Sequence, residues 1–379
     1  MNNERYTVIY MGGFELPDKN AAAQRVLGNA KAIRDIGVNV VLVGVSNDIS
    51  SDAVLSTQKD IQGFDCYEVP YPKGTRSWVD YLINPHHYID VISKYNNTKC
   101  VIFYNFQSIS MHRIIHYCHK RGIKCIADVT EWYQPGGSFI HKQLKSWDTS
   151  YRMNRVHFEC DGLIVISRYL ENYYKERVKL INIPPLIDMA EEKWKKASNQ
   201  SKEYVFSYVG KPSDRKERLD LIIQSLEQLS LDENEKASTL LCIAGITQKE
   251  YEEMYHTVSN TERVRFVGRV PHQEALDIVG RSKWAIVIRN RTRVVEAGFP
   301  TKVVESLACG VPVIANKFSN IEDYLNKDNS ILLEDQSRLT EAISEAFKKS
   351  DSRVVDKTVF DYRNYVKTIE QFLEIVVQE

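Results

Sequence analysis

Two segments of this sequence carry charged side chains at a spacing that a phosphorylated ligand could use. In the first, Lys211 follows the apolar run YVFSYVG, and Lys216 comes just before an expected helix over 217–229. Cationic side chains beside a helix N-terminus suit a diphosphate, because free backbone N–H groups and the helix dipole favour anions there. A solvated charged turn explains the same residues, and on spacing alone it is the favoured interpretation.

The second segment starts at Arg289, which ends the apolar run WAIVIR. A loop that includes Gly298 then enters an expected helix over 301–309, which carries Glu305. Backbone amides in such a loop can bind phosphate oxygens, while the carboxylate accepts hydrogen bonds from sugar hydroxyls. A charge pair between Lys302 and Glu305 on one helix face is the alternative. In this half of the chain we expect ligand contacts from Lys211, Lys216, Arg289, Gly298, Phe299, Thr301, Lys302 and Glu305.

Gly12 and Gly13 follow the first apolar run of the chain, YTVIYMG. Paired glycines there let backbone N–H groups approach a phosphate closely, although a tight strand-to-helix turn explains them equally well. The G-x-G-x-x-G pattern is absent, and no acidic residue ends the second expected strand. A dinucleotide cofactor, and with it a dehydrogenase, is therefore poorly supported.

Strand and helix patterns alternate along the chain and place these residues at strand ends. The alternation stops at a charged, linker-like segment over 188–202 and then restarts. This pattern predicts two doubly wound α/β domains of the Rossmann-like type, with ligands at the carboxyl ends of the strands. We expect an N-terminal domain over 1–187 and a C-terminal domain over 188–360.

Composition and charge exclude other classes of protein. The chain has 379 residues, 43% of them hydrophobic, and its 50 basic residues balance 50 acidic ones. A nucleic-acid polymer is not an expected partner, because such proteins need an excess of Lys and Arg. No apolar stretch is long enough to span a membrane, no secretory signal is visible, and the seven cysteines lack C-x-x-C spacing. A cytoplasmic protein without disulfides or zinc is expected.

The segment EAGFPTKVVESLACGVPVIA resembles the signature of the retaining glycosyltransferases of family 4, which have the GT-B fold. That signature reads roughly E-G-F-G-x-P-x-x-E-A-x-A-x-G-x-P-V-I. The resemblance extends over most of the chain and implies two Rossmann-like domains facing a central cleft. The second domain would hold most of the donor nucleotide-sugar, and the last helix, 361–379, would cross back onto the first domain. Other stretches that agree in order are 160–174, 181–188, 207–223 and 264–279.

The resemblance also implies roles for individual residues. Glu305 corresponds to the glutamate that binds the ribose hydroxyls of the donor. Lys211 and Lys216 correspond to the basic pair on the diphosphate, and Gly13 to a glycine whose backbone faces the same phosphates. The fold stabilises the diphosphate without a metal ion, and no D-x-D motif is present here. We therefore expect no cofactor, and a UDP-sugar as the donor substrate.

Two departures from the family pattern bear on the catalytic residues. One residue more separates Glu296 from Glu305 than separates the two family glutamates, and Lys302 stands where the family has Pro. The family His after the strand KCIADV is also missing, and Asp128 and Glu131 are the carboxylates near its position. We take Asp128, Glu131 and Glu296 as catalytic candidates, while capping or ion pairing explains Glu131 about equally well.

The implied activity is transfer of a sugar to a glycan or lipid-linked acceptor, with retention, in bacterial surface-polysaccharide or glycoconjugate synthesis. Lys211, Lys216 and backbone amides would stabilise the leaving diphosphate, which would take the acceptor's proton. One alternative is a nucleotide-sugar 2-epimerase of the same fold, against which the segment 296–305 argues. Another is a non-catalytic sugar-nucleotide-binding subunit of a transferase complex, which the altered glutamate spacing leaves open.

Residues 139–158 combine basic and aromatic side chains. Such a segment can contact anionic lipid headgroups or a lipid-diphosphate acceptor, on the inner face of the plasma membrane. An ordinary helix packed by its aromatic residues, with a solvated basic face, is the favoured alternative. The residues concerned are Lys142, Lys145, Arg152 and Arg155, with Phe139, Trp147, Tyr151 and Phe158 between them.

Overall fold

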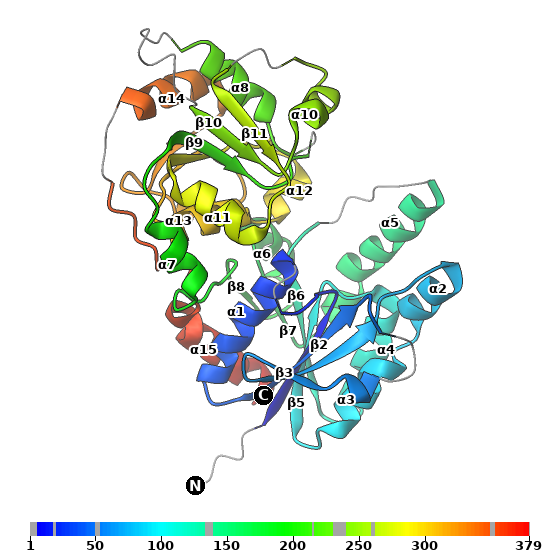
Figure 1. Ribbon diagram of the computed structural model, residues 1–379. Helices are drawn as coiled ribbons and strands as arrows, with labels where there is room; N and C mark the ends of the chain where they lie inside the picture. Colours follow the sequence, from blue (N-terminus) through cyan, green and yellow to red (C-terminus); the bar gives the residue numbers. More distant parts are fainter. Residues whose placement is uncertain are drawn as a thin grey trace. The chain divides into compact units, whose positions relative to one another are not determined.

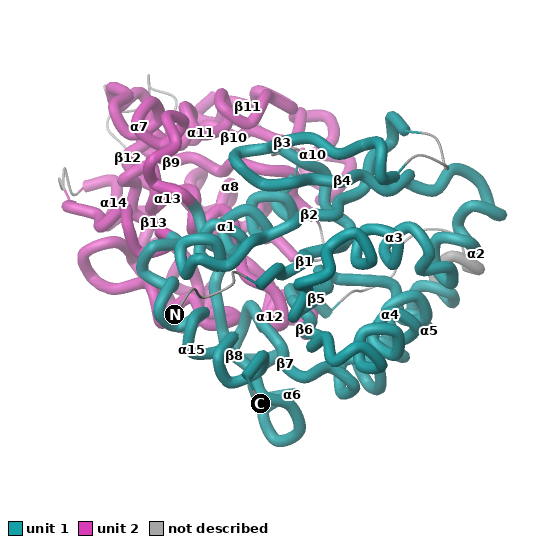
Figure 2. Tube along the Cα trace, turned by 90° about the horizontal axis from the view of Figure 1, so that it is seen from below, with its two compact units in different colours: residues 1–187, 362–379 teal, residues 188–361 magenta. Residues whose placement is uncertain are grey.

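The computed structural model describes residues 6–17, 20–49, 54–132, 139–213, 216–229, 240–258, 262–348 and 353–378. Side chains are described over the same ranges, except for 139–142. The chain forms two compact units, coloured separately in Figure 2. Unit 1 comprises residues 1–187 and 362–379, and unit 2 comprises residues 188–361.

Unit 1 contains an eight-stranded sheet in the order β3-β4-β2-β1-β5-β6-β7-β8. All pairs are parallel except β3 with β4. The central strands are mostly apolar and almost wholly buried, as expected for parallel strands covered on both faces. The strands are β1 (Thr7–Gly12), β2 (Asn39–Ser46), β3 (Lys59–Ile61), β4 (Phe64–Pro70), β5 (Thr98–Tyr104), β6 (Lys124–Val129), β7 (Gly162–Val165) and β8 (Leu180–Asn182).

The helices of unit 1 follow the strands and are labelled in Figure 1. Helix α1 begins where the Asn20 side chain accepts a hydrogen bond from the backbone of Ala23, a usual N-cap. The last helix, α15, packs against α1 and β8 and buries Phe372 and Leu373 in the core of this unit. The helices are α1 (Ala21–Asp35), α2 (Thr75–Ile83), α3 (His86–Lys94), α4 (Ser108–His119), α5 (Phe139–Asn154), α6 (Arg168–Tyr174) and α15 (Val366–Val377), with short 3-10 turns at Val54–Thr57, Val156–Glu159 and Tyr362–Tyr365.

Unit 2 contains a six-stranded parallel sheet in the order β11-β10-β9-β12-β13-β14. Numbered from its own first strand, this is the order 3-2-1-4-5-6 of doubly wound nucleotide-binding sheets, which reverses between β9 and β12. Ligands in such sheets bind beyond the carboxyl ends of the strands at that reversal. The strands are β9 (Tyr204–Val209), β10 (Leu241–Ala244), β11 (Val264–Gly268), β12 (Ser282–Val287), β13 (Val313–Asn316) and β14 (Ser330–Leu333).

The helices of unit 2 include one that the sequence does not predict. The segment 188–202 is linker-like in composition, but α7 lies within it and buries Trp194 and Ala197 against α11. The short α12 also replaces an expected loop around Glu296. The helices are α7 (Glu192–Ser198), α8 (Leu219–Glu227), α10 (Gln248–Tyr255), α11 (His272–Gly280), α12 (Arg293–Ala297), α13 (Thr301–Ala308) and α14 (Leu339–Lys348), with 3-10 turns at Ile321–Asp323 and Gln336–Arg338.

The predicted fold class is confirmed. Each unit is built on a largely parallel sheet with helices between most successive strands, as the alternating pattern of the sequence indicates. The strand ends that carry Gly12 in β1 and Gly210 after β9 both lie where the strand order reverses. These two strand ends therefore locate the candidate site within each unit.

Candidate functional site

The turn after β9 lies against the first turn of α13 in unit 2. Gly210 follows β9 with a φ of +113°, a conformation that favours glycine. A Cβ at this position would lie 2.9 Å from Cε of Lys302. A larger residue would therefore push the Lys302 side chain away from the turn. Lys211, the next residue, is exposed to solvent.

Glu217 is the acidic centre of this region. Its side chain is 4% exposed, and its Oε1 lies 2.8 Å from Nη2 of Arg289 and 3.5 Å from Nζ of Lys302. The backbone N–H of Ser213 donates a hydrogen bond to Oε2 at 3.0 Å. Burial acts to raise the pKa of Glu217, but the charges of Lys302 and Arg289 outweigh it, so that the pKa is lowered. Glu217 is thus a buried carboxylate that two cations keep ionised.

Lys302 is the second member of the cluster and lies in the first turn of α13. Its side chain is 14% exposed, and its ammonium lies 5.0 Å from the centre of the Tyr208 ring. Burial lowers the pKa of Lys302, and the negative charge of Glu217 acts in the opposite direction. The charged form of this lysine therefore depends on its neighbours, unlike that of a surface lysine.

Arg289 is fixed by contacts at both its backbone and its side chain. Its backbone N–H donates to Oδ1 of Asn316 at 2.9 Å, and its carbonyl accepts from Nε2 of Gln336 at 2.8 Å. Its guanidinium binds Glu217, and its buried Nε has no hydrogen-bond partner among the described residues. One donor of Arg289 is therefore buried and unsatisfied among the described residues.

Lys211 and Lys216 complete the basic group. The carbonyl of Lys216 accepts a hydrogen bond from the backbone of Asn290 at 2.9 Å, which ties the turn before α8 to the end of β12. Within the described parts of the chain, neither lysine has an ion-pair partner. A surface pocket beside Lys211 is lined by Gly245, Arg269 and other residues of the turns around α10. Of the residues predicted to contact the donor, Lys211, Lys216, Arg289 and Lys302 thus share one strand-end region.

Glu305 does not pair with Lys302, the charge pair that the spacing on α13 also allows. Its Oε1 lies 3.0 Å from Nε2 of His272, at the start of α11. The Glu305 side chain is 18% exposed, so it is partly covered but reachable. The two charges of α13 therefore have different partners.

The loop between α12 and α13 is held by contacts of Glu296, Gly298 and Phe299 with neighbouring residues. The Glu296 carboxylate pairs with Nε of Arg291 at 3.0 Å and accepts from the backbone N–H of Ser319 at 3.0 Å. The Ser319 hydroxyl donates to the carbonyl of Gly298 at 2.6 Å. Phe299 packs edge-on against Tyr324 and Phe360, while the half-buried Thr301 begins α13. These contacts hold the loop that enters α13.

In unit 1, Gly12 at the end of β1 and Gly13 after it lie in different surroundings. A Cβ on Gly12 would stand 2.3 Å from the carbonyl oxygen of Tyr104, because β1 and β5 are close there. Gly13 is exposed, and a Cβ on it would meet no atom within 4 Å. The structure thus accounts for Gly12 by strand packing, while the backbone of Gly13 is open to solvent.

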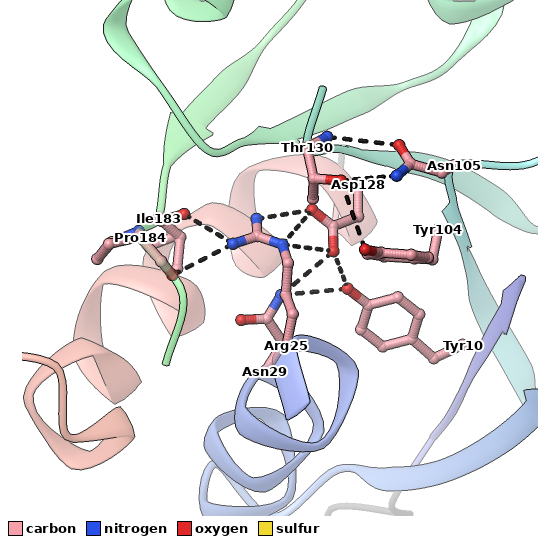
Figure 3. A network of polar contacts seen from close by, with 9 residues as sticks. All are labelled: Tyr10, Arg25, Asn29, Tyr104, Asn105, Asp128, Thr130, Ile183 and Pro184. Carbon is pink, nitrogen blue, oxygen red and sulfur yellow. Dashed lines mark hydrogen bonds and ion pairs between the residues drawn. The ribbon is translucent and has the colours of Figure 1, made fainter. Parts of the chain in front are cut away.

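Asp128, at the carboxyl end of β6, lies in a buried polar network (Figure 3). Its Oδ1 lies 2.7 Å from Nη2 of Arg25, and its Oδ2 accepts hydrogen bonds from the Tyr10 hydroxyl and from Nε of Arg25. Arg25 also donates to the carbonyls of Ile183 and Pro184, at 3.0 and 3.2 Å. Both oxygens of Asp128 are therefore occupied, and the network joins α1, β6 and the segment after β8.

Glu131 and Thr130 follow β6 at the position of the missing family His. Thr130 accepts a hydrogen bond from Nδ2 of Asn105 at 2.6 Å, and Asn105 has a left-handed φ of 40°. Glu131 is half-buried. It is thus more accessible than Asp128.

Residues 189–355 match the family model of the glycosyl transferases group 1. The matched segment contains Glu217, the four basic residues around it and Glu305. The glycines of β1, Asp128 and Glu131 lie outside it. No curated protein matches the chain.

Solved structures show similarity over both units. A sucrose-phosphate synthase from Thermosynechococcus elongatus is 13% identical, with a TM-score of 0.68 over 98% of each chain. Anabaena Alr3699/HepE in complex with UDP and glucose is 12% identical, with a TM-score of 0.63 over 98% of this chain and 100% of that one. A glycosyltransferase from Rickettsia africae is 12% identical, with a TM-score of 0.65 over 99% of this chain and 100% of that one. These likenesses assign the GT-B fold.

Three residues that contact the predicted site residues are not singled out by the sequence: Glu217, Arg25 and His272. Glu217 and Lys302, within the group 1 match, are far apart in the chain, as are Arg25 and Asp128 in unit 1. His272 follows Pro271 in a charged stretch and gives no indication of its contact with Glu305. The one signal that could have indicated them is their position near strand ends, where the residues that are predicted to contact the donor also lie.

Helix α5 differs from the basic surface that its composition suggests. Arg152 is buried and donates to the carbonyl of Phe106 at 2.6 Å, so it is not available to a membrane or acceptor. Leu144 and Trp147 are 55% and 54% exposed, and Trp147 stacks on Tyr151. Among the described side chains, the exposed face of α5 therefore includes large apolar residues, while Phe139 and Lys142 of the predicted segment lie outside the described side chains. Among the described residues, no helix is long and apolar enough to cross a bilayer.

One group of side chains in unit 1 has the types that bind metals. His119, Cys125 and Asp161 bring their ligand atoms within 4.8 Å of one another. Asp161 accepts from the backbone N–H of Cys125 at 2.8 Å and contacts Nε2 of His119 at 3.0 Å. His119 thus has a carboxylate partner that sequence spacing does not show. Burial raises the pKa of the Cys125 thiol, which disfavours the thiolate that a metal would bind.

Proposed function

We propose that this protein is a retaining glycosyltransferase that uses a nucleotide-diphospho-sugar. The observation that carries the proposal is the basic strand-end region of unit 2, formed by Lys211, Lys216, Arg289 and Lys302, with Glu305 on the same helix as Lys302. This region lies at the reversal of strand order in a doubly wound sheet, and nucleotides bind at that place in such sheets. The match to glycosyl transferases group 1 over 189–355 supports the same activity.

The donor would be bound mainly through its diphosphate and ribose. Lys302 and Lys216, with backbone N–H groups of the turn after β9 and of the start of α13, suit the diphosphate. Glu305 would accept hydrogen bonds from the ribose hydroxyls, with His272 holding one of its oxygens. A UDP-sugar is the donor that we propose first. The structure of Anabaena Alr3699/HepE in complex with UDP-glucose is similar to this chain, with a TM-score of 0.61.

The chemistry follows from where charge develops. When the sugar–phosphate bond breaks, the sugar becomes positive and the leaving diphosphate gains negative charge. Fixed cations such as Lys302 and Arg289 stabilise that charge without reorganisation during the reaction. With retention, the leaving phosphate would take the proton of the acceptor hydroxyl on the same face.

Among the catalytic candidates, the contacts suggest distinct roles. Glu131 is the accessible carboxylate beside β6 and is our choice for a contact with the transferred sugar. Asp128 would act indirectly, because both of its oxygens are bound internally and hold Arg25, which in turn binds the carbonyls of Ile183 and Pro184. Glu296 would support the loop that enters α13. Gly13 would offer its backbone N–H to the phosphates.

The acceptor that we propose is a glycan or a lipid-linked sugar, in the synthesis of a bacterial surface polysaccharide or glycoconjugate. Peripheral contact with the inner face of the plasma membrane would come from the exposed Leu144 and Trp147 of α5, because apolar side chains of this kind enter the lipid interface. We propose a cytoplasmic location with this peripheral contact.

The donor proposal is tested by thermal shift with UDP, GDP and ADP and their sugars, followed by an assay for released nucleotide. A ligand that binds only the folded state raises the Tm, and at a fixed concentration the shift is larger for a tighter ligand, because the stabilisation grows with the logarithm of the ratio of ligand concentration to Kd. Glu305→Ala should lower donor affinity about 10- to 100-fold, because a hydrogen bond to a charged group is lost. Glu341→Ala, an exposed glutamate on α14, is the matched control. A protein whose Tm responds to no nucleotide sugar is not this transferase, while binding without turnover points to a non-catalytic subunit.

A further inference from the structure

Glu217 is a buried, ionised side chain that the donor-binding scheme above does not use. Its carboxylate binds Arg289 and Lys302 through one oxygen and the Ser213 backbone through the other. It also forms an isolated backbone bridge with Arg289, so its own backbone is fixed as well. Burying a carboxylate to 4% exposure costs folding free energy unless the charge is paired. Here each partner of the carboxylate lies next to the proposed diphosphate site.

Lys302 is the partner that depends most on this carboxylate. Its stem lies against Gly210, and its ammonium lies over the Tyr208 ring, so its reach is confined. Four charged or titratable groups face it. Burial and the positive charge of Arg289 oppose its charged form, whereas Glu217 and, more weakly, Glu305 favour it. Burial raises the pKa of the Tyr208 hydroxyl, which has no hydrogen-bond partner among the described residues, so this phenol stays neutral and gives no counter-charge.

We propose that Glu217 is a positioning residue for the donor diphosphate: it holds the Lys302 ammonium in its charged form and in place beside the turn after β9. This inference rests on the proposed donor site. Two cations share one carboxylate, so the cluster keeps a net positive charge of one unit toward an incoming phosphate. Without Glu217, Lys302 would be a partly buried ammonium beside Arg289, a setting in which lysines lose their proton readily.

The test compares wild-type protein with Glu217→Gln, which keeps the shape and removes the charge. Two quantities are measured between about pH 6.5 and 9.5. The first is the rate at which acetic anhydride labels Lys302 in the absence of ligand, followed by mass spectrometry. The second is the Kd for UDP-glucose. In Glu217→Gln the midpoint of Lys302 labelling should fall by about one pH unit or more. As the pH rises across this range, the donor affinity of Glu217→Gln should fall, and this fall should be at least about tenfold larger than the fall in wild type.

Lys302→Arg in the Glu217→Gln background is the rescue, because a guanidinium stays charged throughout this range. It should restore a flat dependence of donor affinity on pH. Glu217→Asp keeps the charge but withdraws it by one methylene group, and it should weaken donor binding without steepening the pH dependence. This variant also serves if Glu217→Gln fails to fold. Asp220→Asn, which breaks the neighbouring pair with Arg218, is the control and should leave both profiles unchanged.

The outcomes separate the two proposals. If wild-type protein binds no nucleotide sugar, the donor site and this inference both fall. If it binds UDP-glucose but Lys302 labels with the same midpoint in wild type and Glu217→Gln, the donor site stands and the role of Glu217 is wrong. A shifted midpoint with an unchanged pH dependence of binding likewise overturns the positioning role.

Discussion

Nε2 of His272, at the start of α11, lies 3.0 Å from Oε1 of Glu305, on α13. The contact joins two helices that are separated in sequence by the whole of β12 and α12. It occupies one carboxylate oxygen, and the other has no hydrogen-bond partner among the described residues. In the proposed function Glu305 meets the ribose of the donor, so His272 fixes the direction from which that carboxylate approaches.

His272→Ala should therefore raise the KM for the donor about fivefold and leave kcat nearly unchanged. Loss of one hydrogen bond is worth about 1 kcal/mol, which corresponds to that factor. Initial rates at varied UDP-sugar concentration give the measurement. His116→Ala, an exposed histidine of unit 1, is the control. A fall in kcat at unchanged KM would show that His272 acts elsewhere.

The lowered pKa of Glu217 predicts how its contribution to stability varies with pH. A carboxyl whose folded pKa lies below its ordinary value of 4.5 stabilises the fold above that pH. The contribution is lost as the pH falls through the folded pKa. The difference in unfolding free energy between wild type and Glu217→Gln, from urea titration, should be largest above pH 4.5 and shrink below it. Lys302→Met removes one of the cations that lower this pKa, so in that background the difference should be smaller. An equal difference at every pH would contradict the linkage.

The fold could be predicted from sequence because parallel strands buried on both faces leave continuous apolar runs. Helix α7 could not be predicted, because only Trp194 and Ala197 of its charged segment are buried and two apolar positions are too few to show a helical periodicity. The same limit applies to the site. Strand ends located Lys211 and Lys302, but local spacing suggested a pair between Lys302 and Glu305. The actual partner, Glu217, comes from a different strand end, and only the folded sheet brings the two together.

Gly12 and Gly13 should respond differently to substitution. Gly12→Ala places a methyl group 2.3 Å from the Tyr104 carbonyl oxygen and should lower the free energy of unfolding by about 3 kcal/mol. Gly13→Ala meets no atom within 4 Å and should change stability by less than about 0.5 kcal/mol, while raising the donor KM. Urea unfolding and initial rates on both variants check this. If Gly13→Ala has full activity and an unchanged KM, its backbone does not face the donor phosphates.

The exposed face of α5 predicts a difference between two of its residues. Trp147→Ser should reduce co-sedimentation with vesicles that contain anionic lipid severalfold, because an exposed indole is lost from the interface. Arg152→Met should leave co-sedimentation unchanged and instead lower the Tm, because the buried guanidinium binds the Phe106 carbonyl. Equal co-sedimentation of wild type and Trp147→Ser would remove α5 from the membrane proposal.

The Arg25–Asp128 pair distinguishes a structural carboxylate from a catalytic one. Asp128→Asn leaves Arg25 charged and buried without its counter-ion and should cost about 3–5 kcal/mol of unfolding free energy. In Arg25→Met/Asp128→Asn no uncompensated charge is left, so the double variant should lose less than the sum of the two single losses. Urea titration of the four proteins gives the coupling energy. Donor turnover, measured where each protein is folded, should recover in the double variant relative to Asp128→Asn. Turnover that stays low in every protein lacking the Asp128 carboxylate, whatever its stability, would instead assign this residue a direct role in the reaction.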